Sequence, residues 1–350
     1  DRSNERIRVI DSKGKIRTYA GNGREGFTGD FGPALEASLY KPFGIAFDRK
    51  GNLYIADRGN NRVRKVNTQG IITTVAGDGG FFFMGDNGPA YRASVAGPTG
   101  VVVDDQGILY IADRNNNRIR SVDSQGMITT VAGTGQQDYN GDAEVARETN
   151  LYLPFGVALK PDGSLLVIDR SHYRIRSVDL KRGSIKTIAG NGKLEHSGDG
   201  GPAKNSSIHG ARAIAVDNDG SVFICEREGN SIRKIDTNGT ITTVAGTGDS
   251  GYSGDGELGI NATFRGPKAI RCNKNGDLLI VDTENHAIRI LSSKTNIVET
   301  IAGGSKGGGG DGGTATSAEL DRPHGAISDS RGNVIIADSN NHRVRIAKLN

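Results

Sequence analysis

Cationic side chains occupy matching positions in a segment that recurs along this 350-residue chain. In each copy an acidic residue ends an apolar run, and in the first four copies the next residue is an arginine. These arginines are Arg58, Arg114, Arg170 and Arg227. Convergent guanidinium groups with partly dry walls bind carboxylate, sulfate or phosphate through paired N–H donors. The pattern therefore predicts an anion-binding site, provided that the fold brings the copies together.

A second repeated position opens the first strand expected in each copy, and it changes from copy to copy. The last three copies carry Arg212, Lys268 and His324 there, whereas Phe43 and Phe155 hold it in the first and third. Residues that recur in every copy usually serve the scaffold. Residues that differ from the repeat and share one sign of charge are harder to explain in that way. The alternative is that each arginine forms an ion pair with a neighbouring acid and only holds the repeat together. The predicted ligand-binding residues are Arg58, Arg114, Arg170, Arg212, Arg227, Lys268, His324, Phe43 and Phe155.

The segment behind both positions recurs six times at a nearly constant pitch. Residues 43–77 contain four β-rich segments (43–48, 53–57, 62–66 and 71–77) separated by Gly, Asn and Asp turns. Such a unit is a four-stranded antiparallel meander, and its radial repetition predicts a β-propeller; a linear solenoid usually has shorter repeats. The acidic residue stands at Asp57, Asp113, Asp169, Glu226, Asp282 and Asp338, at intervals of 56, 56, 57, 56 and 56 residues.

The two ends of the chain predict how the last blade is completed. Residues 1–10 align with residues 57–66, and Lys15–Ala20 aligns with a fourth strand, whereas the chain ends on a third-strand segment. We therefore expect an all-β fold, a six-bladed β-propeller of four-stranded antiparallel blades, with the ring closed by an N-terminal strand. The unbroken period favours a single domain over residues 1–350. Its repeat units are about 43–98, 99–154, 155–211, 212–267, 268–323, and 324–350 plus 1–42.

Hairpin pairing predicts which rim of the blades carries the function. If strands 43–48 and 53–57 pair around a turn near residues 50–51, residue 43 lies opposite residue 58. The start of the first strand and the end of the second then share one rim with the long insertions between blades, where binding residues concentrate. Each insertion carries a Gly-Asp pair, which favours a structural turn over a calcium site because one carboxylate is too few ligands. In the second insertion Phe81–Met84 is expected to fold back as core rather than to offer a contact patch.

Composition excludes some classes of protein. Hydrophobic residues make up 35% of the chain, Trp is absent, and no stretch approaches the length of a membrane span. The net charge of +4 is too mild to indicate nucleic-acid binding by itself. The chain does not begin with Met, so we expect a domain of a larger protein. Cys225 and Cys272 fall in inner strands of consecutive blades and favour buried thiols over a disulfide.

The segment Gly-Ile-Ala-Phe-Asp-x-x-Gly-Asn-Leu-Tyr-Ile-Ala-Asp-x-x-Asn-Asn-Arg-Val-Arg-Lys-Val resembles the NHL repeat, and the resemblance covers all six units. With the Gly-Asp-Gly-Gly-Pro-Ala insertion at 198–203, the chain is similar to secreted bacterial NHL proteins and to the propeller of teneurins. The resemblance implies a six-bladed propeller. Members of the NHL-repeat family include RNA-binding modules, protein-interaction modules and the zinc-dependent peptidyl-hydroxyglycine amidating lyase. The resemblance to that lyase implies zinc-binding histidines at the positions where the first strands begin. Only His324 matches here, whereas a catalytic zinc site needs three protein ligands.

These observations lead to one functional prediction and two alternatives. We expect a non-catalytic recognition module, extracellular or at the cell surface, that binds a protein, a peptide or a small anionic ligand at the loop-rich mouth. We expect no metal and no cofactor. The first alternative is a lyase or hydrolase acting on an anionic substrate at the same mouth. The second is RNA binding, which the low aromatic content of 5% disfavours because base stacking needs aromatic side chains.

Overall fold

The computed structural model describes residues 4–10, 16–329 and 332–348. These residues form β-strands and single 3₁₀ turns, and they contain no α-helix. The strands follow one another in antiparallel meanders, and the fold class is all-β, the six-bladed β-propeller. Contacts group the chain into two compact units. The N-terminal unit holds Asp1–Leu159, Gly163–His172 and Arg176–Lys186, and the C-terminal unit holds Lys160–Asp162, Tyr173–Ile175 and Thr187–Asn350.

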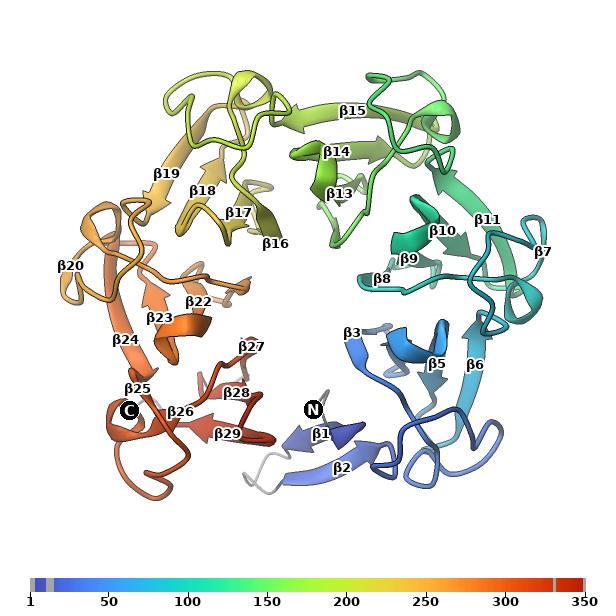
Figure 1. Ribbon diagram of the computed structural model, residues 1–350, viewed down its shortest axis with the longest axis horizontal. Coiled ribbons are helices and arrows are strands. Elements are labelled where there is room, and N and C mark those ends of the chain that lie inside the picture. Colours follow the sequence, from blue (N-terminus) through green and yellow to red (C-terminus); the bar gives the residue numbers. More distant parts are fainter. Residues whose placement is uncertain (1–3, 11–15, 330–331, 349–350) are drawn as a thin grey trace. The chain divides into compact units, whose positions relative to one another are not determined.

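The first three blades belong to the N-terminal unit, apart from the few residues of the third blade just given. Their strands are β3 (Pro42–Phe47), β4 (Leu53–Asp57), β5 (Arg62–Val66) and β6 (Ile72–Ala76); β8 (Val101–Val103), β9 (Leu109–Asp113), β10 (Arg118–Val122) and β11 (Met127–Ala132); and β12 (Val157–Leu159), β13 (Leu165–Asp169), β14 (Arg174–Asp179) and β15 (Ser184–Ala189). Each blade pairs its strands in chain order (Figure 1). The first strands of neighbouring blades touch: β3 contacts β8, and β8 contacts β12.

The C-terminal unit contains the other three blades, with the same order of pairing. Their strands are β16 (Ala211–Val216), β17 (Val222–Glu226), β18 (Ser231–Ile235) and β19 (Ile241–Ala245); β21 (Ala269–Cys272), β22 (Leu278–Asp282), β23 (Ala287–Leu291) and β24 (Ile297–Gly303); and β27 (Gly325–Ser328), β28 (Val334–Asp338) and β29 (Arg343–Ala347). Here too the first strands touch, β16 with β21 and β21 with β27. Two short strands, β25 (Ser305–Lys306) and β26 (Glu319–Leu320), pair in parallel in the last insertion.

The predicted strands of the first blade are confirmed to within one residue at each end, but the predicted pairing is not. The first two strands pair Ile45 with Ile55 and Phe47 with Leu53, one residue away from the expected register. The register shifts between Pro42 and Ile45, so that Pro42 lies opposite Asp57. A bulge of this kind is not visible in an apolar pattern of period two. The start of the first strand and the end of the second nevertheless share one rim, as expected.

The core lies between successive blades, because the second strand of each of the first five blades is buried on both faces. All five residues of β4, β9, β13, β17 and β22 are buried. Ala56 of the first blade packs in one cluster with Leu109 and Ile111 of the second. Cys225 and Cys272 lie in one such cluster in the C-terminal unit, and both are free thiols. Blade-to-blade packing therefore fixes the first and second strands, whose ends form the rim described below.

The insertions cover the outer edges of the blades. The Gly-Pro segment of the second insertion forms β7 (Gly88–Pro89), which pairs with the outermost strand β11. Pro33 forms the matching bridge to Ile71 in the first blade. Covering an exposed strand edge removes a template for aggregation, and proline is tolerated at such an edge. In the fifth blade β20 (Glu257–Leu258) pairs with β24 in the same way.

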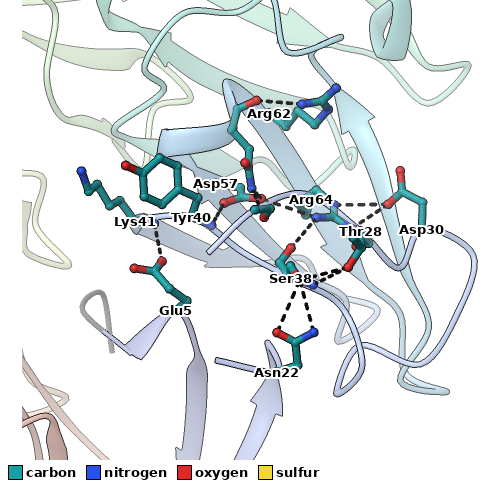
Figure 2. Close-up of polar contacts among 12 residues, drawn as sticks. Glu5, Asn22, Thr28, Asp30, Ser38, Tyr40, Lys41, Asp57, Arg62 and Arg64 are labelled. Atoms are coloured by element: carbon teal, nitrogen blue, oxygen red, sulfur yellow. Dashed lines mark hydrogen bonds and ion pairs between the residues drawn. The ribbon is translucent and has the colours of Figure 1, made fainter. Parts of the chain in front are cut away.

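A buried arginine in the third strand of each blade joins the insertion to the second strand. In the first blade the Arg64 side chain is fully buried, and its Nη2 lies 2.8 Å from Oδ1 of Asp30 in the Gly-Asp pair (Figure 2). Its Nη1 lies 3.4 Å from Oδ2 of Asp57 at the end of β4. Burial raises the pKa of Asp57 to about 6, although hydrogen bonds from Asn60 and the Tyr40 N–H and the charge of Arg64 lower it.

The same three-residue bridge occurs in all six blades, so it is part of the scaffold. The recurrent Gly-Asp pairs therefore have a structural role, as the sequence indicated, and the acidic residue at the end of each second strand pairs with an arginine of the third strand. The bridges are Asp30–Arg64–Asp57, Asp86–Arg120–Asp113, Asp142–Arg176–Asp169, Asp199–Arg233–Glu226, Asp255–Arg289–Asp282 and Asp311–Arg345–Asp338.

The N-terminal segment forms a hairpin of its own. β1 (Ile7–Ile10) pairs antiparallel with β2 (Ile16–Ala20), which is the strand expected to close the ring. Lys15 and residues 1–3 lie outside the described residues. The hairpin belongs to the N-terminal unit and β27–β29 to the C-terminal unit, so the completion of the last blade by this segment stays a prediction.

Candidate functional site

Short turns at the end of each second strand hold the predicted arginines. Arg58, Arg114 and Arg170 each open a 3₁₀ turn, namely η2 (Arg58–Asn60), η4 (Arg114–Asn116) and η6 (Arg170–His172). The acid before each turn accepts a backbone N–H from the preceding insertion, as Asp113 does from Ala96 at 2.7 Å. The remaining 3₁₀ turns are η3 (Ala90–Arg92), η5 (Ala146–Glu148), η7 (Ala203–Asn205), η8 (Gly259–Asn261), η9 (Thr283–Asn285) and η10 (Ala315–Ser317).

In the N-terminal unit five predicted residues form one cluster, which we call the arginine–phenylalanine cluster: Phe43, Arg58, Arg114, Phe155 and Arg170. The two phenylalanine rings meet edge to face, with centroids 5.5 Å apart and planes at 88°. The guanidinium of Arg58 lies 5.7 Å from the Phe43 ring, and that of Arg170 lies 6.0 Å from the Phe155 ring. Burial, followed by the charges of Arg58 and Arg170, lowers the pKa of Arg114. The charges of Arg58 and Arg170 therefore reach Arg114.

Arg114 carries the strongest indication that this cluster can take up an anion. Its Nη1 donates to the neutral amide oxygen of Asn115 at 2.9 Å, and it forms no ion pair within the described part of the chain. Its Nε is buried and has no hydrogen-bond partner among the described residues. A buried donor without an acceptor costs about 1–3 kcal/mol, and an anionic ligand would remove that cost.

Close approach of the first strands brings these side chains together. A Cβ added to Gly44 would lie 2.3 Å from the carbonyl oxygen of Thr99 in the next blade, so only glycine fits there. Thr99 in turn donates its hydroxyl to the Phe155 carbonyl at 2.7 Å. Glycine next to Phe43 and threonine in place of a third phenylalanine thus allow Phe43 and Phe155 to meet across the second blade.

In the C-terminal unit three further predicted residues gather around one carboxylate. We call Arg227, Lys268, Glu284, Arg322 and His324 the Glu284 cluster. Oε1 of Glu284 lies 2.7 Å from Arg322 Nη2, 3.2 Å from Lys268 Nζ and 4.0 Å from Arg227 Nη2. Lys268 Nζ also lies 3.0 Å from His324 Nε2. Burial raises the pKa of Glu284, but hydrogen bonds from Arg322 and Lys268 outweigh it, so that the net shift is downward.

Sequence reasoning missed Glu284 and Arg322, although the repeat carries a signal for the first. The position two residues after the signature acid is Gly59, Asn115 or Ser171 in the N-terminal unit, and it becomes Glu228 and Glu284 in the fourth and fifth blades. The same comparison that singled out Lys268 would have found these acids. Arg227 pairs with both of them, at 3.0 Å from Glu228 and 4.0 Å from Glu284. Arg227 and Lys268 therefore form ion pairs of the kind that the alternative describes.

The remaining predictions have mixed outcomes. Arg212 lies in β16 where the register shifts between Ala211 and Ala213, and its charge acts on the Cys225 thiol, whose pKa burial raises. Phe83 folds back, with the guanidinium of Arg118 3.6 Å from its ring. Phe81 and Phe82 are exposed instead, so the fold-back prediction holds for only part of that segment.

One arrangement in the fourth blade contains the residue types of a hydrolase triad but lacks its geometry. His196 Nδ1 lies 3.1 Å from Glu226 Oε2, and the Ser231 hydroxyl donates to the same oxygen at 2.8 Å. His196 Nε2, the nitrogen that would take a proton from a nucleophile, faces the Thr243 hydroxyl at 3.1 Å. Ser231 is fully buried, so no substrate reaches it. Within the described residues no three His, Cys, Asp or Glu side chains are grouped as a metal site requires.

Two protein-family models match parts of this chain. Residues 4–83, 82–140 and 191–251 match the family model of the teneurin NHL domain, and residues 320–347 match that of the NHL repeat. This chain belongs to the teneurin NHL domain family. The resemblance to the NHL repeat that the sequence suggested is confirmed.

Curated relatives are longer proteins of several kinds. The chain is 28% identical to Teneurin-1 of Gallus gallus over 288 residues, which are 71% of this chain and 10% of that protein. It is 26% identical to NHL repeat-containing protein 2 of Gallus gallus over 344 residues, 89% of this chain and 47% of that protein. It is 28% identical to the chloroplastic protein SUPPRESSOR OF QUENCHING 1 of Arabidopsis thaliana, covering 69% of this chain and 24% of that protein. The chain thus spans less than half the length of each of these relatives.

Solved structures of low sequence identity share the fold alone. A streptogramin B lyase structure superposes with a TM-score of 0.61 at 16% identity, over 96% of this chain and 84% of that one. An auxiliary nutrient binding protein from Bacteroides thetaiotaomicron gives a TM-score of 0.62 at 17% identity, over 98% of this chain and 83% of that one. One fold therefore carries both catalysis and binding. No helix in the described part of this NHL domain has the length and apolar character needed to cross a membrane.

Proposed function

We propose that this NHL domain is a recognition module whose arginine–phenylalanine cluster binds a small organic anion. The observation that carries the proposal is Arg114, which pairs with a neutral amide while the charges of Arg58 and Arg170 act on it. Carboxylate or phosphate oxygens would accept hydrogen bonds from Arg114, and the rings of Phe43 and Phe155 would contact an apolar part of the ligand. A peptide carboxylate and a free aromatic acid share this chemistry.

The proposal is one of binding without catalysis. The cluster contains arginine and phenylalanine, which at neutral pH provide neither a general base nor a nucleophile. An extracellular or cell-surface setting, and a partner protein that presents the anion, remain part of the proposal.

Calorimetric titration with benzoate, which joins a carboxylate to a ring, tests the proposal. A charge-assisted paired contact contributes about 1.5–3 kcal/mol, so Arg114→Met should weaken benzoate binding by about tenfold to a hundredfold. Arg182→Met is the matched control, because the Arg182 side chain is 85% exposed in the same unit, and it should leave the affinity unchanged. Equal losses in both variants, or no saturable benzoate binding by the original protein, would contradict the proposal.

A further inference from the structure

Lys268 differs from an ordinary surface lysine in its surroundings. Lys268 directly precedes β21. The equivalent position in the three N-terminal blades is occupied by Phe43, Thr99 and Phe155. Only 9% of its side chain is exposed, whereas lysine normally keeps its ammonium group in water. The residue therefore breaks both the repeat and the usual preference of its type.

The Glu284 cluster contains more positive groups than the acid that joins them can balance. Arg227, Lys268 and Arg322 all contact Oε1 of Glu284. Arg227 has a second acidic partner in Glu228, but Lys268 has Glu284 and the imidazole of His324. Arginine does not give up its proton in a protein, so lysine is the cation that can relieve the excess charge. Burial first, and then the charges of Arg322 and Arg227, lower the pKa of Lys268 against the opposing effect of Glu284.

We propose that Lys268 is a reactive amine that forms a reversible imine with small carbonyl compounds bearing a carboxylate, such as glyoxylate and 2-oxo acids. Desolvation and neighbouring cations are the two features that turn a lysine into a nucleophile for carbonyl carbon. Arg322 suits the carboxylate of such a compound, because its side chain is 41% exposed and its Nε has no hydrogen-bond partner among the described residues.

The reaction needs no oxidant, reductant or metal. The neutral Lys268 amine attacks the carbonyl carbon, the C=O electron pair moves to oxygen, and that oxygen gains a proton. The nitrogen loses a proton, for which His324 Nε2 at 3.0 Å is the adjacent acceptor. Water then leaves as the C=N bond forms, so one amine and one carbonyl give one imine and one water. This site shares no residue with the arginine–phenylalanine cluster and does not depend on the function proposed for it.

Glyoxylate with cyanoborohydride, which reduces the imine to a stable carboxymethyl-lysine, tests the proposal on the intact chain. Peptide mapping then compares Lys268 with Lys306, an exposed lysine of the same unit, in the same sample. At neutral pH Lys268 should be labelled several-fold faster than Lys306. The ratio should fall toward one near about pH 10, where ordinary lysines also become neutral. Labelling of Lys268 at or below the rate of Lys306 at neutral pH would overturn the proposal.

Two comparisons separate the parts of the argument. Acetaldehyde lacks the carboxylate, so it should label Lys268 with a smaller advantage over Lys306 than glyoxylate does. An equal advantage for both aldehydes would overturn the role of Arg322. Glu284→Gln removes the acid that holds the ammonium, so it should speed glyoxylate labelling of Lys268 and leave Lys306 unchanged. Slower labelling of Lys268 in a variant that melts like the original protein would contradict the charge argument.

Discussion

The two cation clusters arise from the same repeat positions but differ in how their charge is balanced. In the arginine–phenylalanine cluster, Arg114 hydrogen-bonds to the neutral Asn115, and the two residues that are not arginine, Phe43 and Phe155, are aromatic. In the Glu284 cluster, an acid replaces the glycine or polar residue that follows the arginine position, and three cations converge on it. An acid at this repeat position thus distinguishes the internally paired Glu284 cluster from the cluster for which we propose anion binding.

This difference matters because the scaffold is the same in both units. The buried bridge from the Gly-Asp pair through the third-strand arginine to the second-strand acid is formed in every blade, with 2.6 Å between Arg120 and Asp86 and 2.6 Å between Arg233 and Asp199. Because these bridges already join the strands within each blade, we expect the arginines that follow the second strands to contribute less to stability.

The largest expected effect tests whether scaffold and mouth arginines are distinct. Arg120→Met should reduce the free energy of unfolding by about 3–5 kcal/mol, because it leaves the buried carboxylate of Asp113 without its partner. Arg114→Met, six residues away in the same blade, should change it by less than about 1 kcal/mol, since no ion pair is lost. Denaturant unfolding of both variants measures the difference. A similar loss of unfolding free energy in both variants would show that Arg114 has a structural role like that of Arg120. The distinction between the two kinds of arginine would then be wrong.

Much of the fold could be predicted from the sequence, because it depends on features that recur. The six copies place the second strands and the Gly-Asp turns, and in the first blade Leu53–Asp57 and Arg62–Val66 begin and end where the pattern indicated. The register of the first hairpin could not be predicted, since it depends on a bulge near Pro42 that no residue type announces.

The candidate site could be predicted only as a set of residue types. The repeat located Arg58, Arg114 and Arg170, but contact between Phe43 and Phe155 depends on the space left by Gly44 and Thr99 in three dimensions. The sequence also did not show that the signature acid pairs with a buried arginine seven residues further along, in the next strand. Distances of this kind are set by strand pairing rather than by spacing in the sequence.

A smaller effect is expected when the balance of the Glu284 cluster is changed. Glu284→Gln introduced together with Arg114→Met should recover sulfate affinity that Arg114→Met lowers, because Arg227 and Arg322 then lose the negative charge that they share. The gain should be about tenfold in affinity, equivalent to about 1.4 kcal/mol, relative to Arg114→Met alone. Titration with sulfate at low ionic strength measures it, and Glu257→Gln, which changes an exposed acid of the same unit, is the control. Unchanged sulfate affinity in the double variant would mean that Glu284 does not account for the expected difference in anion binding between the two clusters.

The smallest effect concerns the aromatic side of the comparison. Phe43→Leu keeps an apolar side chain but removes one ring of the edge-to-face pair, an interaction of about 0.5–1.5 kcal/mol. If the ring contacts the ligand, benzoate binding should weaken by about twofold to tenfold while sulfate binding stays the same. Phe47→Leu changes an exposed phenylalanine of the same strand and should affect neither anion. The Arg58 guanidinium lies 5.7 Å from the Phe43 ring, so the ring could instead orient that arginine. In that case sulfate and benzoate would lose affinity in parallel, and the phenylalanines would belong to the support of the cation cluster rather than to the ligand-binding surface.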